Sequence, residues 1–158
     1  MTHNGAARPH ELRLDLPAAH SAERMARGVL RQFAQRERVP AAEIDTLEFV
    51  AGELLTNAVD HGGGERALRE EDLRSRVRMS LVLVVQDGAW TLRVGDQGGG
   101  DPELLRARIT DSDDEPDLDD DRGRGFFLLA QMVDRLEVER SADGLGLEVV
   151  AIRRYAQG

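Results

Sequence analysis

The amino-acid sequence predicts a two-layer sandwich of the α/β (α+β) class, in which about three helices cover one face of a mixed, mostly antiparallel sheet. One observation is the order of the periodic segments: strand, helix, helix, two strands, loop, helix and two strands. Another is that consecutive strands are joined by short turns, which favours antiparallel neighbours with helices packed on one face. The length of 158 residues and the 41% of apolar residues fit one domain spanning residues 1–158.

The first half of the chain is expected to supply one strand and two helices. Residues 1–9 are expected to form a disordered tail, and residues 11–16 alternate polar and apolar side chains as a half-buried strand does. Apolar residues then recur at helical spacing from Ser21, the expected N-cap, until Pro40 ends the first helix. The second helix begins just after Pro40 and is expected to end at the glycine-rich residues 61–64, where glycine can adopt the left-handed cap conformation.

The middle of the chain predicts a β-hairpin. Residues 65–74 are highly charged and are expected to form an insertion or a short helix. Residues 76–86 and 90–94 are both strand-like, and Asp87-Gly88 lies between them. Asp-Gly between two apolar runs is a strong signal for a tight hairpin turn, so these two strands should be neighbours in the sheet.

The last third combines an acidic loop, a helix and a second hairpin. Residues 101–122 include the stretch 111–121, in which eight of eleven residues are acidic, and such a self-repelling block is expected to be mobile. A third helix is expected to start around Gly125. Residues 135–141 and 147–154 then form the closing pair of strands.

Composition excludes several kinds of function. The net charge is -9, and all 21 basic residues are arginine, so neither Schiff-base lysines nor a Walker A phosphate loop is present. With no cysteine, disulfides, thiolate metal sites and cysteine nucleophiles are excluded. The longest apolar run is five residues and no secretory signal precedes it, which argues against a membrane span and makes a cytoplasmic location the expectation. The acidic balance also argues against direct binding of nucleic acid.

Polar residues recur along one side of the second predicted helix. Glu53 and Asn57 are four residues apart and therefore lie one turn apart on the same face, and Asp60 and His61 continue this stripe. A carboxylate and a carboxamide on one stripe could hold a metal-bound phosphate and a hydroxyl or water. The alternative is a solvated helix face with a C-terminal cap.

A second candidate follows the strand 90–94. Asp96 comes directly after this apolar run, where its carboxylate could accept a hydrogen bond from an exocyclic amine. Gly98 and Gly100 would let the backbone approach a ligand closely. The alternative is an ordinary turn that ends a strand.

A third candidate precedes the third predicted helix. Gly123 and Gly125 would leave free N–H groups aimed at an anion, where the helix dipole also favours negative charge. Arg122 or Arg124 adds a guanidinium suited to phosphate. The alternative is a loop-to-helix junction with a surface arginine.

Together, the order and spacing of these three motifs resemble the N box, G1 box and G2 box of the GHKL ATPase superfamily. The pattern reads E-x-x-x-N-A-x-x-H-G, then D-x-G-x-G, then an acidic segment, then G-x-G at a helix start. The size of the chain is most similar to that of the anti-sigma-factor serine/threonine kinases of the RsbW and SpoIIAB type. The resemblance covers roughly residues 10–155 and implies the Bergerat ATP-binding fold.

The resemblance also implies a role for each matching residue. Asn57 would coordinate Mg²⁺, Glu53 would act as general base, and Asp96 would bind the adenine amino group. Residues 101–122 would be the ATP lid, and Arg122 or Arg124 would stabilise developing charge during catalysis. The remaining nucleotide-binding residues that the resemblance implies are Asp60, His61, Gly98, Gly100, Gly123, Gly125 and Phe126.

One position departs from the family pattern beside Asp96. The family often has threonine near the start of the last strand, where this chain reads Gly146-Leu147-Glu148. Because Leu147 has no hydroxyl, a water or another group must complete that wall of the site.

The resemblance implies an ATP- and Mg²⁺-dependent regulator that phosphorylates serine or threonine of a STAS-domain antagonist and sequesters a sigma factor. It implies contact with neither membrane nor nucleic acid, and the oligomeric state, including a homodimer, stays open. The main alternative is a non-catalytic GHKL-fold module that uses ATP as a structural ligand or no longer binds it. A histidine-kinase fragment is less favoured, because His20, the nearest candidate, lies at the start of the first helix.

Overall fold

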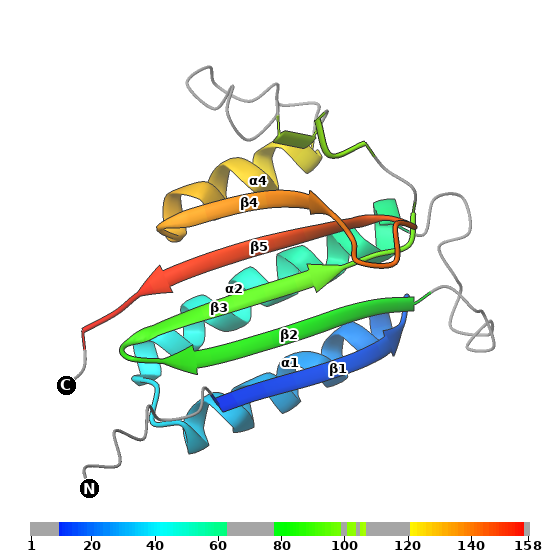
Figure 1. Ribbon diagram of the computed structural model, residues 1–158. Coiled ribbons are helices and arrows are strands. Elements are labelled where there is room, and N and C mark those ends of the chain that lie inside the picture. The colour runs from blue at the N-terminus through cyan, green and yellow to red at the C-terminus, as the bar shows by residue number, and fades with distance from the viewer. Residues whose placement is uncertain (1–9, 63–77, 99–100, 104, 107–120, 157–158) are drawn as a thin grey trace, which may run out of the picture.

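In the described part of the chain, a five-stranded sheet packs helices α1, α2 and α4 against one of its faces (Figure 1). The computed structural model describes residues 10–62, 78–98, 101–103, 105–106 and 121–156, and it describes residues 61–62 and 121–124 by their backbone alone. The strands are β1 (His10–Pro17), β2 (Arg78–Gln86), β3 (Ala89–Gly95), β4 (Arg135–Arg140) and β5 (Leu147–Arg154). Their order in the sheet is β1-β2-β3-β5-β4, and all four pairings are antiparallel. The α+β sandwich predicted from the sequence is therefore confirmed.

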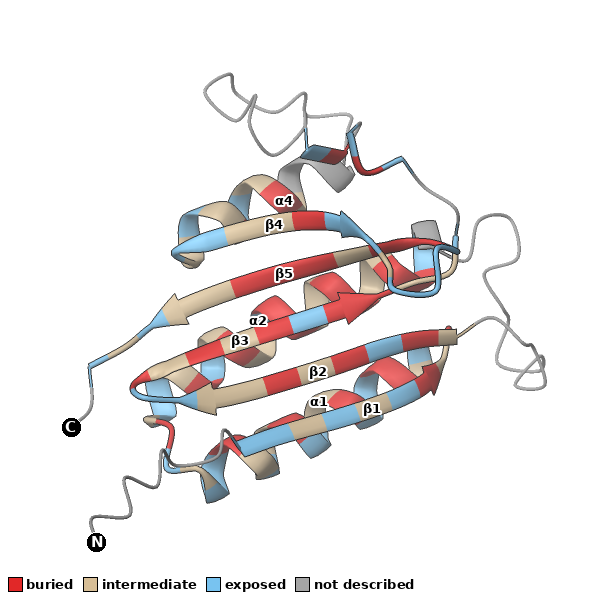
Figure 2. Cartoon of the chain, in the orientation of Figure 1, coloured by how far each residue is buried: buried red, intermediate tan, exposed pale blue. Residues whose placement is uncertain are grey.

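Alternation of side chains gives the sheet one buried and one open face. Along β1, for example, Leu12, Leu14 and Leu16 pack in or against the core, whereas Glu11, Arg13 and Asp15 are exposed. The burial colours alternate along this strand accordingly (Figure 2). The predicted hairpin at residues 87–88 is also confirmed. Asp87 and Gly88 have φ angles of 51° and 72°, and two consecutive positive φ angles are those of the type I′ turn that a two-residue hairpin favours.

Three helices cover the buried face of the sheet. They are α1 (His20–Arg36), α2 (Ala41–Asn57) and α4 (Asp121–Met132), and α2 continues into a π-helical turn, η1 (Ala58–Gly62). The core lies between the two layers, and the largest of its fully buried side chains are Trp90, Phe126, Leu30, Leu47, Leu55, Met79, Leu81, Leu83, Leu92 and Leu129. Among the described residues, no helix is both long enough and apolar enough to cross a membrane.

The start of α1 differs from the prediction. Ser21 is not the N-cap, because the helix begins at His20 and the cap position is Ala19, with φ -140° and ψ 146° and no side-chain hydrogen bond. Ala18 and Ala19 are only 2% and 1% exposed, and the Ala19 N–H donates to the Pro17 carbonyl at 2.8 Å. Packing of small side chains against the core therefore sets this helix start in place of a polar cap.

The start of α4 also differs, since the helix begins at Asp121 and not around Gly125. Gly123 and Gly125 therefore lie inside the first turns of the helix. An aspartate at the N-terminus is favoured by the helix dipole, which offsets the weak helix propensity of the two glycines.

Several expectations fall outside the described residues. They concern the tail 1–9, the insertion 65–74, Gly100 and most of the acidic segment 101–122.

Candidate functional site

Three of the predicted motifs meet at one end of the sheet. The C-terminal end of α2, the end of β3 and the start of α4 all lie there (Figure 1). These elements carry Glu53 and Asn57, Asp96, and Gly125 respectively. Residues separated by as many as 72 positions in the chain are thus gathered by the antiparallel return of the strands.

Glu53 on α2 faces Gly125 on α4. A Cβ atom placed on Gly125 would lie only 3.3 Å from Oε2 of Glu53. The two helices can therefore approach here because position 125 has no side chain, which leaves the half-buried Glu53 carboxylate beside the first turns of α4. Phe126, predicted to bind nucleotide, places its side chain in the core at 1% exposure, so it anchors α4 and offers the site only its backbone.

Asn57 is the last residue of α2 and has an unusual amide. Its Nδ2 atom is buried and has no hydrogen-bond partner. A buried polar group without a partner is costly, and in native proteins it points to an additional ligand or to water. The carboxamide oxygen is a suitable ligand for Mg²⁺, which keeps several waters and substrate phosphates in its shell. No group of three or more acidic or histidine side chains able to hold a metal occurs in the described part of the chain, so the metal predicted at Asn57 would depend on phosphate and water for its other ligands.

The π-helical turn after Asn57 is tied to the start of α1. His20 Nε2 lies 3.0 Å from Asp60 Oδ1, so Asp60 contacts a side chain of the first helix, and its role in nucleotide binding stays a prediction. No sequence signal links these two residues, which are 40 positions apart. The contact fixes the turn that follows Asn57, whereas the side chain of His61 lies outside the described atoms.

Asp96 is held by backbone groups from two directions. Its Oδ1 accepts hydrogen bonds from the N–H of Gly98 at 3.0 Å and of Leu147 at 3.2 Å, and its own N–H donates to the Leu147 carbonyl at 2.9 Å. The backbone of Leu147 thus contributes to the wall where the family often has a threonine hydroxyl. No donor contacts Oδ2 among the described residues, which makes this oxygen the one available to an adenine amine.

Gly146 is required for this arrangement. A Cβ at position 146 would lie 2.6 Å from the carbonyl carbon of Asp96 and would overlap both its carbonyl oxygen and Oδ1. Sequence analysis noted Gly146 only as a neighbour of Leu147. Its role depends on a contact across 50 residues that nothing local in the sequence predicts.

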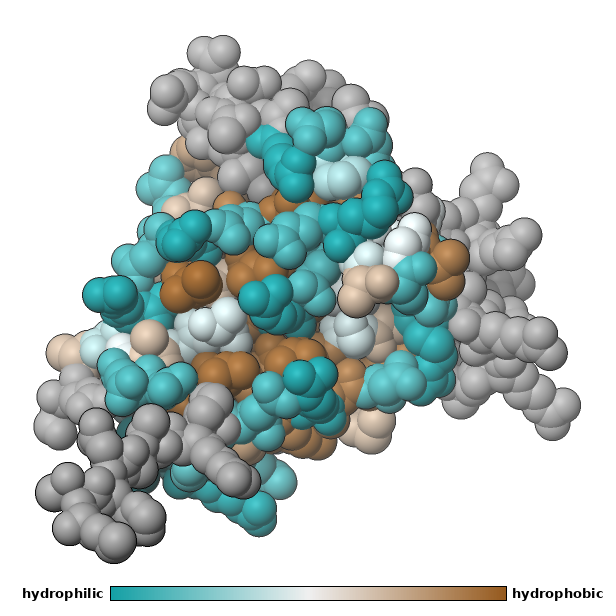
Figure 3. Space-filling view, in the orientation of Figure 1, coloured by the Kyte–Doolittle hydropathy of each residue, from teal (hydrophilic) through white to brown (hydrophobic). Residues whose placement is uncertain are grey.

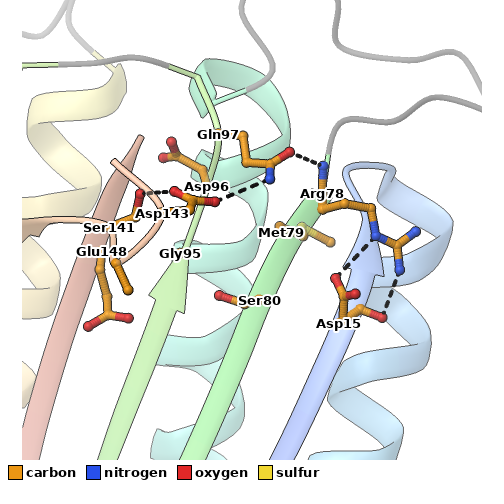
Figure 4. A pocket seen from close by; sticks show the side chains of 11 residues that line it. Asp15, Arg78, Met79, Ser80, Gly95, Asp96, Gln97, Ser141, Asp143 and Glu148 are labelled. Carbon is orange, nitrogen blue, oxygen red and sulfur yellow. Dashed lines mark hydrogen bonds and ion pairs between the residues drawn. The ribbon is translucent and has the colours of Figure 1, made fainter. Parts of the chain in front are cut away.

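A hydrogen-bonded network lies beside Asp96 (Figure 4). The Gln97 carboxamide accepts from the Arg78 N–H at 2.9 Å and donates to Asp143 Oδ2 at 3.3 Å. Asp143 also accepts from the Ser141 hydroxyl at 2.7 Å and the Leu145 N–H at 2.9 Å. These donors, Ser141 first, hold the pKa of Asp143 below its usual value. Gln97 and Asp143 were both missed by the sequence analysis.

A hollow of about 240 Å³ lies beside this network. Its lining includes Asp15, Ser80, Gly95 and Glu148, whose side chains or positions are on the open face of the sheet. Asp96 and Gln97 also line the hollow, whereas Glu53 and Asn57 do not, so the hollow adjoins only the Asp96 part of the place where the three motifs meet. The side chains of Arg122 and Arg124 lie outside the described atoms, and their predicted roles stay predictions.

The family model of the histidine kinase-like ATPase domain matches residues 16–152. The chain belongs to the histidine kinase-like ATPase family. This match includes all three motifs, and it confirms the resemblance predicted from their order and spacing.

Relatives of this ATPase domain include proteins named anti-sigma F factor. The one from Clostridium acetobutylicum is 26% identical over 151 residues, covering 93% of this chain and 95% of that protein. The one from Geobacillus stearothermophilus is 28% identical over 130 residues, covering 82% and 83%. The chain is thus similar to anti-sigma regulators over nearly its full length.

Two solved structures share the fold of this ATPase domain. A chain of the SiaB–SiaC complex from Pseudomonas aeruginosa has a TM-score of 0.56 and 15% identity, covering 89% of this chain and 88% of that one. The structure of the RsbU and RsbW domains of Rv1364c from Mycobacterium tuberculosis has a TM-score of 0.58 and 17% identity, covering 94% of this chain and 33% of that one. At these identities the likeness concerns the fold alone.

Proposed function

We propose that this chain is an anti-sigma-factor-type regulator that binds Mg-ATP, phosphorylates a serine or threonine of a STAS-domain antagonist and sequesters a sigma factor. The observation that carries the proposal is the meeting of Glu53 and Asn57 with Asp96 and Gly125 at one end of the sheet. The similarity to anti-sigma F factors over 93% of the chain supports the choice of partners. A sigma-factor partner would place the protein in the cytoplasm.

The nucleotide would be recognised at both of its ends. Asp96 Oδ2 would accept a hydrogen bond from the adenine amino group, while Oδ1 stays fixed by the N–H groups of Gly98 and Leu147. Free N–H groups in the first turn of α4 would face the phosphates, because a helix N-terminus favours anions. Asn57 would hold Mg²⁺ through its carboxamide oxygen, and its buried Nδ2, which has no protein partner, would donate to a phosphate oxygen or a water.

The bound Mg-ATP would supply the transferable phosphoryl group and the charge neutralisation that this transfer needs. Glu53 is the carboxylate beside the first turns of α4, so it is the group that would accept the proton of the partner's hydroxyl. Arg122 or Arg124 would stabilise the negative charge that develops during transfer. Positioning and electrostatics account for most of the catalysis in this class of reaction.

The test compares two substitutions on the same helix. Glu53→Gln keeps the size of the side chain and removes the base, so ATP binding should persist while phosphate transfer to the partner falls by about 10²-fold or more. Glu48→Gln is the matched control, because Glu48 pairs with Arg31 at 2.5 Å on the α1 side of α2, and it should leave transfer unchanged. Transfer is measured with labelled ATP and STAS-domain proteins from the same organism.

The non-catalytic alternative predicts a different result. If wild-type protein binds ATP but transfers phosphate to none of these STAS-domain proteins, the proposed kinase activity is wrong. The chain would then act as a nucleotide-dependent binding module. If wild type and Glu53→Gln transferred phosphate equally, the proposed kinase activity would stand, but Glu53 would be rejected as its general base.

A further inference from the structure

Gln97 is the residue between Asp96 and Gly98, and its side chain joins two other segments of the chain (Figure 4). Its Oε1 accepts a hydrogen bond from the backbone N–H of Arg78, the first residue of β2, at 2.9 Å. Its Nε2 donates to Oδ2 of Asp143, in the turn between β4 and β5, at 3.3 Å. One carboxamide therefore ties the end of β3 to the start of β2 and to that turn.

The two partners of Gln97 fix the direction of both hydrogen bonds. A backbone N–H can only donate, so the oxygen of the carboxamide must face Arg78. The amide nitrogen is then left to face Asp143, whose ionised carboxylate can only accept. Neither glutamate nor methionine could replace glutamine here. Glutamate would set a second carboxylate against Asp143, and methionine would make neither bond as well.

The carboxylate of Asp143 is arranged to receive this donor. Its Oδ1 accepts from the Ser141 hydroxyl at 2.7 Å and from the Leu145 N–H at 2.9 Å. Its Oδ2 accepts from Gln97. The Ser141 hydroxyl first, and then the Leu145 N–H and Gln97, hold the pKa of Asp143 below its usual value. The carboxylate is therefore charged at neutral pH, as the bond from Gln97 requires.

The same two segments are also joined at Asp96. Its Oδ1 accepts from the N–H of Gly98 at 3.0 Å, which closes an Asx turn with Gln97 as its middle residue. It also accepts from the N–H of Leu147 at 3.2 Å, just after the turn that contains Asp143. The bond between Gln97 and Asp143 is thus a separate link between these segments. Contacts at separate points restrict how one segment can rotate against the other, and such supporting bonds keep a binding group in its productive orientation.

We propose that Gln97 is a positioning residue for Asp96, and that its hydrogen bond to Asp143 raises the affinity for the nucleotide base without touching the base. This inference rests on the proposed function, because it takes Asp96 as the residue that binds the adenine amine. Without the link, Asp96 samples orientations in which Oδ2 does not face the amine. The apparent affinity then falls by the fraction of protein that has the competent orientation.

Reversal of the hydrogen bond tests this role in the full-length chain. Gln97→Glu keeps the acceptor for Arg78 and sets two carboxylates against each other, whereas Asp143→Asn sets two amide nitrogens against each other. Each single variant should raise the Kd for Mg-ATP by about tenfold. In the double variant Gln97→Glu/Asp143→Asn, the amide at position 143 can donate to the carboxylate at position 97. Its Kd should return to within about threefold of wild type.

A nucleotide without the amine shows whether the effect passes through Asp96. Purine riboside triphosphate lacks the exocyclic amino group, so wild type should bind it about tenfold more weakly than ATP, because one oxygen of Asp96 is left unpaired. Gln97→Glu should lose most of this preference, and the double variant should regain it. A purely structural role of Gln97 would change the affinity for both nucleotides equally. Calorimetric titration measures each Kd at a temperature where circular dichroism shows every variant to be folded.

Glu43→Gln is the matched control. Glu43 pairs with Arg153 at 2.8 Å near the start of α2, at the other end of the helix from Asn57. Its substitution should lower the stability and leave both dissociation constants unchanged. The exchanges at positions 97 and 143 keep polar side chains of similar size. Hydrophilic groups are already interspersed among apolar ones on the surface that Figure 3 shows, so the fold should tolerate these exchanges.

The outcomes separate this role from the proposed function. A wild-type protein that binds no Mg-ATP, or that binds both nucleotides equally, would reject Asp96 as the adenine ligand and the role of Gln97 with it. If wild type prefers ATP and Gln97→Glu shows the same preference, only the role of Gln97 is rejected. A double variant that fails to recover would reject it too. The absence of kinase activity would not affect the test, because binding is measured and not transfer.

Discussion

The carboxylate of Asp96 is oriented almost entirely by main-chain groups. Two N–H groups fix Oδ1, and the missing side chain at Gly146 allows the β4–β5 turn to approach it. Backbone donors on a sheet reorient less than a hydroxyl on a rotatable side chain, so the second oxygen is held in a defined direction. The chain thereby positions its proposed adenine ligand despite having leucine where the family often has threonine.

Gly146→Ala tests this arrangement at a single atom. The added Cβ would overlap Asp96, so the free energy of unfolding should fall by about 1–3 kcal/mol, the usual cost of overpacking. ATP affinity should fall with it, because the turn can relax only by moving away from Asp96. Urea denaturation and calorimetric titration measure the two effects. A variant with wild-type stability and affinity would show that the turn does not hold Asp96.

Asn57→Ala should separate binding from stability. The buried Nδ2 makes no hydrogen bond, so its loss should change the free energy of unfolding of the ligand-free protein by less than about 1 kcal/mol. Mg²⁺-dependent ATP binding should be lost, because the proposed metal ligand is gone. Calorimetry with and without Mg²⁺ provides the comparison, and unchanged affinity would reject Asn57 as that ligand.

The residues of the site were predictable to different degrees. Glu53, Asn57 and Asp96 could be named because their side-chain chemistry and spacing carry a recognisable pattern. The supporting roles of Gly146 and Leu147 could not, because they use a missing side chain and a backbone N–H. The contact between His20 and Asp60 was missed for another reason: two exposed residues on different helices meet only after the sheet has placed both helices.

At the level of elements, the strand boundaries predicted from the sequence agree with the structure more closely than the predicted helix starts do. Alternation and the Asp87-Gly88 turn determine β2 and β3 locally. The start of α1 instead depends on the burial of Ala18 and Ala19, and the start of α4 depends on residues that precede its glycines. Helix ends are therefore decided by packing that the local pattern does not contain.

Gly28 on α1 offers a test of helix propensity without packing. It lies in the middle of the helix, is exposed, and an added Cβ would meet no atom within 4 Å. Gly28→Ala should therefore raise the free energy of unfolding by about 0.5–1 kcal/mol, because alanine loses less backbone entropy in a helix. Chemical denaturation measures the change, while ATP affinity should stay at the wild-type value. A loss of stability would mean that this helix face has a role that the isolated chain does not reveal.

The β4–β5 turn should respond to acid through Asp143. Its pKa is held below the usual 3.8 by the Ser141 hydroxyl, then by the Leu145 N–H and Gln97, so the charged form is favoured in the folded state. A lowered pKa gives stability that is present above the unfolded value and is lost as the pH falls below about 4. Asp143→Asn should remove this part of the pH dependence. Melting curves between pH 3 and pH 7 compare the two proteins, and identical slopes would contradict the assignment.

At the scale of the whole molecule, the two layers have separate roles. The helix layer brings Glu53 and Asn57 to one end of the sheet, and the sheet layer holds Asp96 at that same end. The net charge of -9 disfavours the approach of an uncompensated ATP anion, and a bound Mg²⁺ would offset part of that charge.

Ligand-induced stabilisation of the whole domain tests whether Mg-ATP binds at the site formed by α2, β3 and α4. A ligand that binds only the folded state adds about 2.7 kcal/mol at 100 times its Kd. For a chain of 158 residues, 1 kcal/mol shifts the Tm by roughly 2–4 °C, so saturating Mg-ATP should raise the Tm by about 5–10 °C. Glu53→Gln should keep the shift because it removes only the base, whereas Asn57→Ala should lose it. Thermal melts at one fixed ATP concentration, with Mg²⁺ or with a chelator, measure these differences. If Mg-ATP raised the Tm of Asn57→Ala as much as that of wild type, the nucleotide would bind elsewhere on the molecule, and the site built from α2, β3 and α4 would be wrong.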